Sequence, residues 1–205
     1  DLTVEVTDTN GFPNDQRSGT TLSFDDSSRT LTISPTGSDF HFYELGFKFE
    51  KTDAESIEID DIEGSSLVYY DNGVLSKTLN PNEGQIGLII RTKCLVAFLY
   101  WDATNKELLH LGDERHGISM SPVTHAYLHY TRGAQYLSGL GLGDIIADGD
   151  GDLDESAQFS IASGFTADED LITSYSSIAS NVGLPVYYLS GANGDMRRIT
   201  KTGFS

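Results

Sequence analysis

The chain has 205 residues, and its 31 acidic and 13 basic residues give it a formal net charge of −18. This balance excludes nucleic acid as a partner, because phosphate binding needs a basic stripe and the basic residues here are scattered. No segment reaches the roughly 18–20 consecutive apolar residues of a membrane helix, so we expect no membrane insertion. The length is sufficient for a buried core.

Strands are predicted through most of the first half of the chain. Apolar and polar residues alternate with a period close to two, as in half-buried strands, in residues 2–6, 30–34, 40–50 and 57–59. Two further runs are almost continuously apolar, residues 86–90 and 94–101. Such runs are typical of central strands covered on both faces, so we expect both to lie in the core.

Turn chemistry separates these strands. Residues 25–29, 71–73 and 102–106 each lie between two strand-like segments and are rich in Asp, Asn, Ser and Gly. The Asn72-Gly73 pair suits a type I′ turn. Each of the three segments therefore predicts a hairpin.

Two segments are compatible with helices. Residues 121–131 have Ser121 as a potential N-cap and Pro122 at the first helical position, although their aromatic and β-branched residues also suit a strand. Residues 168–180 begin with acids and space their apolar residues three or four apart, which is the stronger helix signal.

The fold predicted from these elements is all-β and mostly antiparallel, a β-sandwich-like structure with one or two short helices. We expect a single β-rich domain over residues 1–205. The alternative is a split into a β-sandwich at 1–115 and a glycine-rich β module at 116–205, with its short helix near 168–180.

An acidic loop follows the glycine-rich segment and predicts a calcium site. It carries carboxylates at every second position, namely Asp148, Asp150, Asp152 and Asp154. Such alternation can direct several oxygens toward one calcium ion. Leu153 and Phe159 stand where an EF-hand requires Gly and Glu, so the loop would be of another kind. A solvated acidic turn is the alternative interpretation.

Three of the five histidines, His116, His125 and His129, lie within fourteen residues. The four-residue spacing of His125 and His129 would place both imidazoles on one face of a helix and could bind a transition metal with His116, although the glutamate of an HExxH motif is absent. A fourth ligand would come from Asp113 or Glu114. As a strand, the segment would instead present a polar face with a structural or interfacial role. We favour that interpretation, with Asp113 or Glu114 paired to Arg132.

No other pattern predicts catalysis. The chain has no nucleophile elbow, phosphate-binding loop or dinucleotide fingerprint. We therefore expect no catalytic residues, no enzyme activity and no cofactor other than calcium. The aromatic residues that could stack on a sugar are Trp101, Tyr69, Tyr70, Tyr187 and Tyr188.

Several segments, in this order, resemble those of structural proteins of tailed bacteriophages, of the tail, baseplate or fibre. They are 64-GSSLVYYDNGVLS-76, 97-AFLYWDATNKELLHLGDERHG-117, 124-THAYLHYTRGA-134, 163-SGFTADEDL-171 and 184-LPVYYLSGANGDMR-197. The resemblance extends from about residue 40 to residue 200. It implies a β-rich virion protein that assembles with copies of itself or with other virion proteins. If this protein also takes part in host attachment, its further partner would be a glycan of the host surface. The resemblance implies no catalytic or ligand-binding residues.

Two other functions remain open from the sequence. One is a carbohydrate-binding module, assisted by calcium at the acidic loop and using Trp101 or the paired tyrosines as stacking platforms. The other is a metal-dependent hydrolase built on the three histidines.

Overall fold

The structure of the protein, a computed structural model, describes residues 10–147, 157–168, 171–180 and 184–201. Strands make up 56% and helices 14% of it, in several antiparallel sheets, which confirms the predicted all-β class. The chain divides into two compact units, Asp1–Tyr127 and Leu128–Ser205.

The described residues of the first unit form three sheets. Their strand orders are β11-β1-β4-β5, β10-β9-β7-β8 and β2-β3-β6. In chain order the elements are β1 (Asn10–Gly11), α1 (Asn14–Ser18), β2 (Thr20–Asp25), β3 (Thr30–Pro35), β4 (Phe40–Glu44), β5 (Phe47–Lys51), β6 (Glu55–Glu58), β7 (Gly64–Asp71), β8 (Val74–Leu79), α2 (Glu83–Thr92), β9 (Cys94–Asp102), β10 (Glu107–Asp113) and β11 (Gly117–Ile118). Helix α3 (Pro122–Thr131) follows, and the division between the units falls inside it.

The three predicted hairpins are confirmed, as β2–β3, β7–β8 and β9–β10. At the tip of β7–β8, Asn72 has φ 49° and Gly73 has φ 76°. A type I′ turn requires positive φ at both central residues. The pair therefore sets the register of this hairpin, as the sequence predicts.

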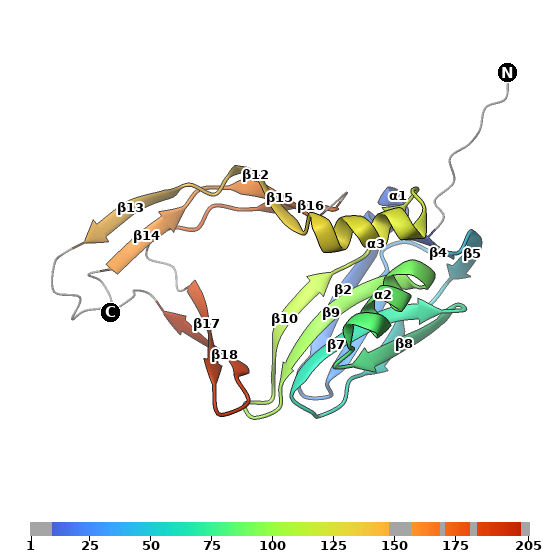
Figure 1. Cartoon of the computed structure of the whole chain (residues 1–205), viewed down its shortest axis with the longest axis horizontal. Helices are drawn as coiled ribbons and strands as arrows, with labels where there is room; N and C mark the ends of the chain where they lie inside the picture. Colours follow the sequence, from blue (N-terminus) through green and yellow to red (C-terminus); the bar gives the residue numbers. More distant parts are fainter. Residues whose placement is uncertain (1–9, 148–156, 169–170, 181–183, 202–205) are drawn as a thin grey trace, which may run out of the picture. The chain divides into compact units, whose positions relative to one another are not determined.

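The sheet β10-β9-β7-β8 is covered on both faces, which gives the unit its sandwich-like layers (Figure 1). On one face Val68, Tyr70, Val96, Leu99 and Trp101 join a core with Phe12, Leu31, Ile33, Phe40 and Phe42. On the other face Leu67 and Leu95 pack against α2 and against Ala126 of α3. Residues 94–101 are thus the predicted central strand.

The strand predicted at residues 86–90 is wrong, because this segment lies in α2. A capping box starts the helix: the Asn82 side chain accepts from the Gln85 backbone N–H at 3.0 Å, and the Gln85 side chain accepts from the Asn82 N–H at 3.0 Å. Ile89 and Ile90 then face the sheet, while Leu88 is exposed. The apolar run is therefore one face of an amphipathic helix.

Residues 122–131 form α3, so the helix interpretation holds and the favoured strand interpretation is wrong. The Ser121 hydroxyl accepts from the Thr124 backbone N–H at 3.2 Å, as an N-cap does, and Pro122 occupies the first helical position. This local chemistry outweighs the β-branched and aromatic residues, since His125 and Ala126 gain burial on the helix.

After the end of α3, the regular structure in the described residues of the second unit is all strand. These residues form a three-stranded sheet β12-β15-β16 and two hairpins, β13–β14 and β17–β18. The strands are β12 (Ala134–Gly139), β13 (Leu142–Ala147), β14 (Ala157–Ile161), β15 (Gly164–Asp168), β16 (Leu171–Tyr175), β17 (Leu184–Ser190) and β18 (Asp195–Lys201).

The helix predicted at 168–180 is wrong, because Leu171–Tyr175 form strand β16 and pair with β15 in register from Gly164↔Tyr175 to Asp168↔Leu171. Ile172 and Thr173 are β-branched and favour the strand once a partner is present. The helical spacing of the apolar residues in 168–180 gives no information about this pairing with β15.

Candidate metal centre

The segment that positions His116 is held by β1. Gly11 pairs with Gly117, and the Phe12 backbone N–H donates to the His116 carbonyl at 2.8 Å. Gly11 has φ 80°, and a Cβ there would lie 2.0 Å from the His116 carbonyl oxygen. Only glycine permits this approach, so the place of His116 depends on a strand more than one hundred residues earlier.

The charged residues before His116 form their own network. Asp113 binds the Arg115 guanidinium through both carboxylate oxygens at 2.8 Å and lies 3.5 Å from Arg17. Arg115 also donates to the Thr20 hydroxyl. Burial raises the pKa of the Asp113 carboxyl, but the hydrogen bonds and charge of Arg115, with that of Arg17, outweigh it and lower the pKa overall. Asp113 is therefore engaged by Arg115 and Arg17 within the first unit. The predicted pairing of Asp113 or Glu114 with Arg132 stays a prediction.

His116 and His125 meet inside the first unit. Their Nε2 atoms are 3.2 Å apart, and the side chains are 7% and 0% exposed. The His116 Nδ1 lies 2.9 Å from the Glu114 carbonyl oxygen. Since a carbonyl only accepts, this Nδ1 carries the hydrogen and the Nε2 lone pair is directed at His125.

His129 is one helical turn after His125 on the continuous helix α3, and its side chain is partly buried. One ring nitrogen from each of His116, His125 and His129 lies within 4.8 Å of the other two. The structure thus brings together the three histidines that the sequence singled out. Asp113, proposed as a fourth ligand, is held by Arg115 instead.

The acidic loop with Asp148, Asp150, Asp152 and Asp154 lies outside the described residues. Calcium binding there stays a prediction.

The prediction that Trp101 could serve as a sugar-stacking platform is wrong. Trp101 is 1% exposed, contacts the core, and donates its indole N–H to Asp61 at 3.0 Å. Tyr70 is likewise buried. Tyr187 and Tyr188 are exposed, but they are consecutive on β17 and so point to opposite faces. No single platform is formed by this pair.

A second surface was missed by the sequence interpretation. In the described part of the second unit, the buried hydrophobic side chains are Ala167 and Leu171 alone. The large apolar side chains that are 41–73% exposed are Tyr130, Tyr136, Leu137, Leu142, Ile145, Phe165, Ile172, Tyr175, Tyr187, Tyr188, Leu189 and Ile199. The alternation of these strands resembles that of half-buried strands, and nothing local shows what covers them.

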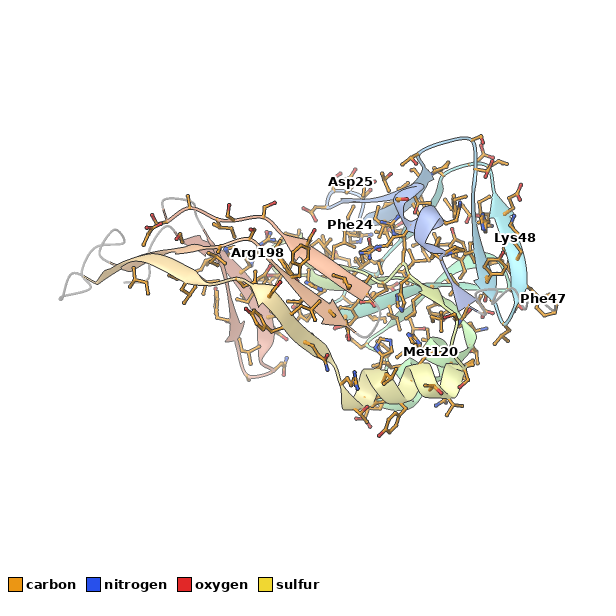
Figure 2. The ribbon with its side chains drawn as sticks, turned by 90° about the horizontal axis from the view of Figure 1, so that it is seen from above. Phe24, Asp25, Phe47, Lys48, Met120 and Arg198 are labelled. Carbon is orange, nitrogen blue, oxygen red and sulfur yellow. The ribbon has the colours of Figure 1, made fainter. Side chains whose placement is uncertain are left out.

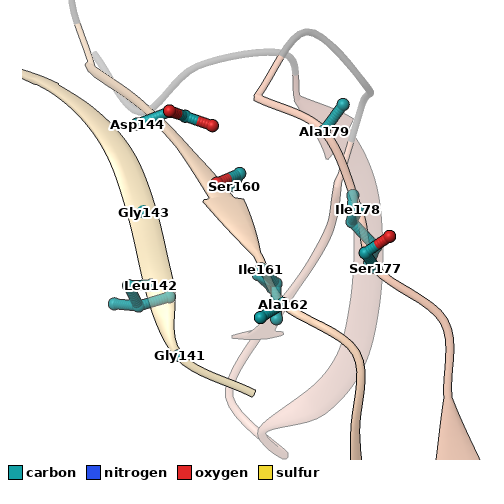
Figure 3. A pocket seen from close by; sticks show the side chains of 10 residues that line it. All are labelled: Gly141, Leu142, Gly143, Asp144, Ser160, Ile161, Ala162, Ser177, Ile178 and Ala179. Carbon is teal, nitrogen blue, oxygen red and sulfur yellow. The ribbon is translucent and has the colours of Figure 1, made fainter. Parts of the chain in front are cut away.

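This apolar surface includes a hollow of about 500 Å³ inside the second unit (Figure 3). Its walls are the segments of Leu142, Ile161 and Ile178, and the last two join through an isolated antiparallel bridge. The lining is mostly small or aliphatic, so the hollow suits an apolar side chain better than a polar ligand.

The chain matches no family model, no curated protein and no solved structure at a significant level. Of the helices in the described residues, none has the length and apolar character to cross a membrane.

Proposed function

We propose that this protein is a virion structural component of a tailed phage, in the tail, baseplate or fibre, which acts by assembling with copies of itself and not by catalysis. The observation that carries the proposal is the apolar surface of the second unit, where large side chains on nearly every described strand are exposed. Contiguous apolar surface on an isolated chain marks an interaction site.

The architecture of this unit supports assembly. Hairpins β13–β14 and β17–β18 are two-stranded sheets, and such hairpins are marginally stable in water unless a further layer packs on them. Their edges also carry backbone groups able to pair with another chain. Neighbouring chains would supply both the packing and the edge pairing.

The distribution of the apolar groups favours a ring of copies. Tyr187, Tyr188 and Leu189 follow one another on β17 and are all exposed, so both faces of the hairpin present apolar surface. In a two-fold dimer both chains use the same surface patch, so only one patch of each chain is buried. In a ring of three or more copies each chain buries two different patches, one against each neighbour. We therefore expect at least three copies.

The sequence resemblance to tail, baseplate and fibre proteins supports the virion location. The acidic surface, with a net charge of −18, agrees with a soluble assembly that does not bind nucleic acid. The rival carbohydrate-binding function loses Trp101, one of its predicted stacking platforms, because this side chain is buried in the core.

Light scattering after size exclusion, with native mass spectrometry, tests the assembly. The full chain should form a discrete oligomer of three or more copies. The double variant Ile145→Ser, Leu189→Ser should shift dissociation to at least tenfold higher protein concentration, since burying one such side chain contributes about 1.5–3 kcal/mol. A monomeric wild-type chain would overturn the proposal, and a dimer would refute the ring.

A matched control is Phe47→Ser with Val74→Ser in the first unit. Both side chains are as exposed as those changed above, and Phe47 points away from β5 into solvent (Figure 2). This variant should assemble like the wild type. The virion location is tested separately by mass spectrometry of purified phage particles. The chain should be detected in them, and its absence would refute the virion location.

A further inference from the structure

We propose that His116, His125 and His129 bind one transition-metal ion of the zinc type, with one ring nitrogen of each as a ligand. This inference is independent of the proposed assembly. It concerns the junction between the β10–β11 connection, which carries His116, and helix α3, which carries the other two.

The spacing of the nitrogens fits such an ion. Tetrahedral zinc bonded to two imidazoles at 2.0–2.1 Å sets their nitrogens about 3.3 Å apart. The Nε2 atoms of His116 and His125 are 3.2 Å apart. One ring nitrogen of His129 lies within 4.8 Å of a ring nitrogen of each of the other two histidines.

His116 is already oriented as a ligand. Its Nδ1–H donates to the Glu114 carbonyl at 2.9 Å, which fixes the ring and leaves Nε2 with its lone pair. Histidines that bind zinc characteristically donate their other ring N–H to a carbonyl or carboxylate in this way. The backbone of His116 is itself held by the hydrogen bond from Phe12.

The ligand chemistry selects the class of ion. Three imidazoles suit zinc, copper or nickel, whereas calcium and magnesium prefer oxygen ligands. Water would complete the fourth tetrahedral position. Because the ligands come from two separate segments, the ion would cross-link α3 to the β10–β11 connection and stabilise the folded state.

The test uses the untagged full chain, stripped with chelator and dialysed against zinc. We expect one zinc per chain by elemental analysis and a rise in Tm of roughly 5–10 °C at a hundredfold excess over Kd. Cobalt in place of zinc should give the visible absorption of a tetrahedral site. Absence of stoichiometric zinc, or an unchanged Tm, would mean that His116 and His125 share only a hydrogen bond, and would overturn the proposal.

Variants identify the ligands. His129→Gln changes the partly buried ligand, so it should keep the metal-free Tm while lowering zinc affinity by more than the roughly 10–100-fold typical of losing an outer-shell partner. The matched control is His41→Gln with His110→Gln, which removes the remaining two histidines and should leave zinc binding unchanged. Wild-type affinity in His129→Gln, or lost binding in the control, refutes the assignment.

Discussion

The buried carboxylate of Glu44 accepts a hydrogen bond from the backbone N–H of Gly73 at 2.7 Å, although 29 residues separate them. Its other oxygen accepts from the Asn72 N–H at 3.0 Å. Burial raises the pKa of Glu44, and the hydrogen bonds from Gly73 and Asn72 oppose that rise. Strand β4 thereby anchors the type I′ turn of β7–β8 to its own sheet.

Glu44→Gln should destabilise the first unit. The amide keeps one acceptor oxygen but turns its NH₂ toward one of the two backbone donors, which costs about 1–3 kcal/mol when a buried N–H is left unsatisfied. Urea unfolding followed by Trp101 fluorescence measures this. Glu50→Gln on the exposed side of β5 is the control and should change stability by less than about 0.5 kcal/mol. Equal effects of the two changes would contradict the anchoring role.

The Asp113–Arg115 pair predicts a pH dependence of stability. Because the pKa of Asp113 is lowered from its ordinary value of 3.8 in the folded state, its contribution is fully present above that value and is lost as the pH falls through the folded pKa. Asp113→Asn should therefore cost roughly 1–3 kcal/mol at pH 7 and progressively less below pH 4. Unfolding free energies of both proteins between pH 3 and 7 test this, and a pH-independent difference would contradict it.

The capping box of α2 predicts a smaller effect. Asn82→Ala removes the acceptor for the Gln85 N–H and should destabilise the first unit by about 1 kcal/mol. Asn82→Asp keeps a capping oxygen at the start of the helix and should retain most of the stability. Thermal unfolding of the two variants makes the comparison. An aspartate as harmful as alanine would show that the cap is not what stabilises α2.

Local signals predicted most of the first unit. Asn72 and Gly73 set a hairpin because a two-residue turn depends on their own φ angles. The run 94–101 has no helix cap and is long enough for a central strand. The strand predicted at 86–90 was wrong because the helix signal lies before the apolar run, in the capping residues Asn82 and Gln85.

Tertiary contacts decide what the sequence could not. Leu171–Tyr175 become a strand because β15 pairs with them, a partner that helical spacing does not reveal. For the metal centre, the spacing of His125 and His129 was visible in the sequence. The arrival of His116 beside them depends on β1 pairing with β11 and on α3 packing over the sheet, so no local pattern contains it.

The two units should respond differently to protein concentration. Trp101, the only tryptophan, lies in the core of the first unit, so its fluorescence reports that unit alone. The first unit has its own core, whereas the described strands of the second unit bury few apolar side chains. If copies of the chain stabilise the second unit, its unfolding must depend on concentration by mass action.

Far-ultraviolet circular dichroism should therefore show a transition whose midpoint rises by several degrees per tenfold increase in concentration, while the Trp101 transition stays fixed. The Ile145→Ser, Leu189→Ser variant should lower the midpoint of the circular-dichroism transition and leave that of the Trp101 transition unchanged. A single coincident transition, independent of concentration, would show that the second unit needs no neighbouring copy.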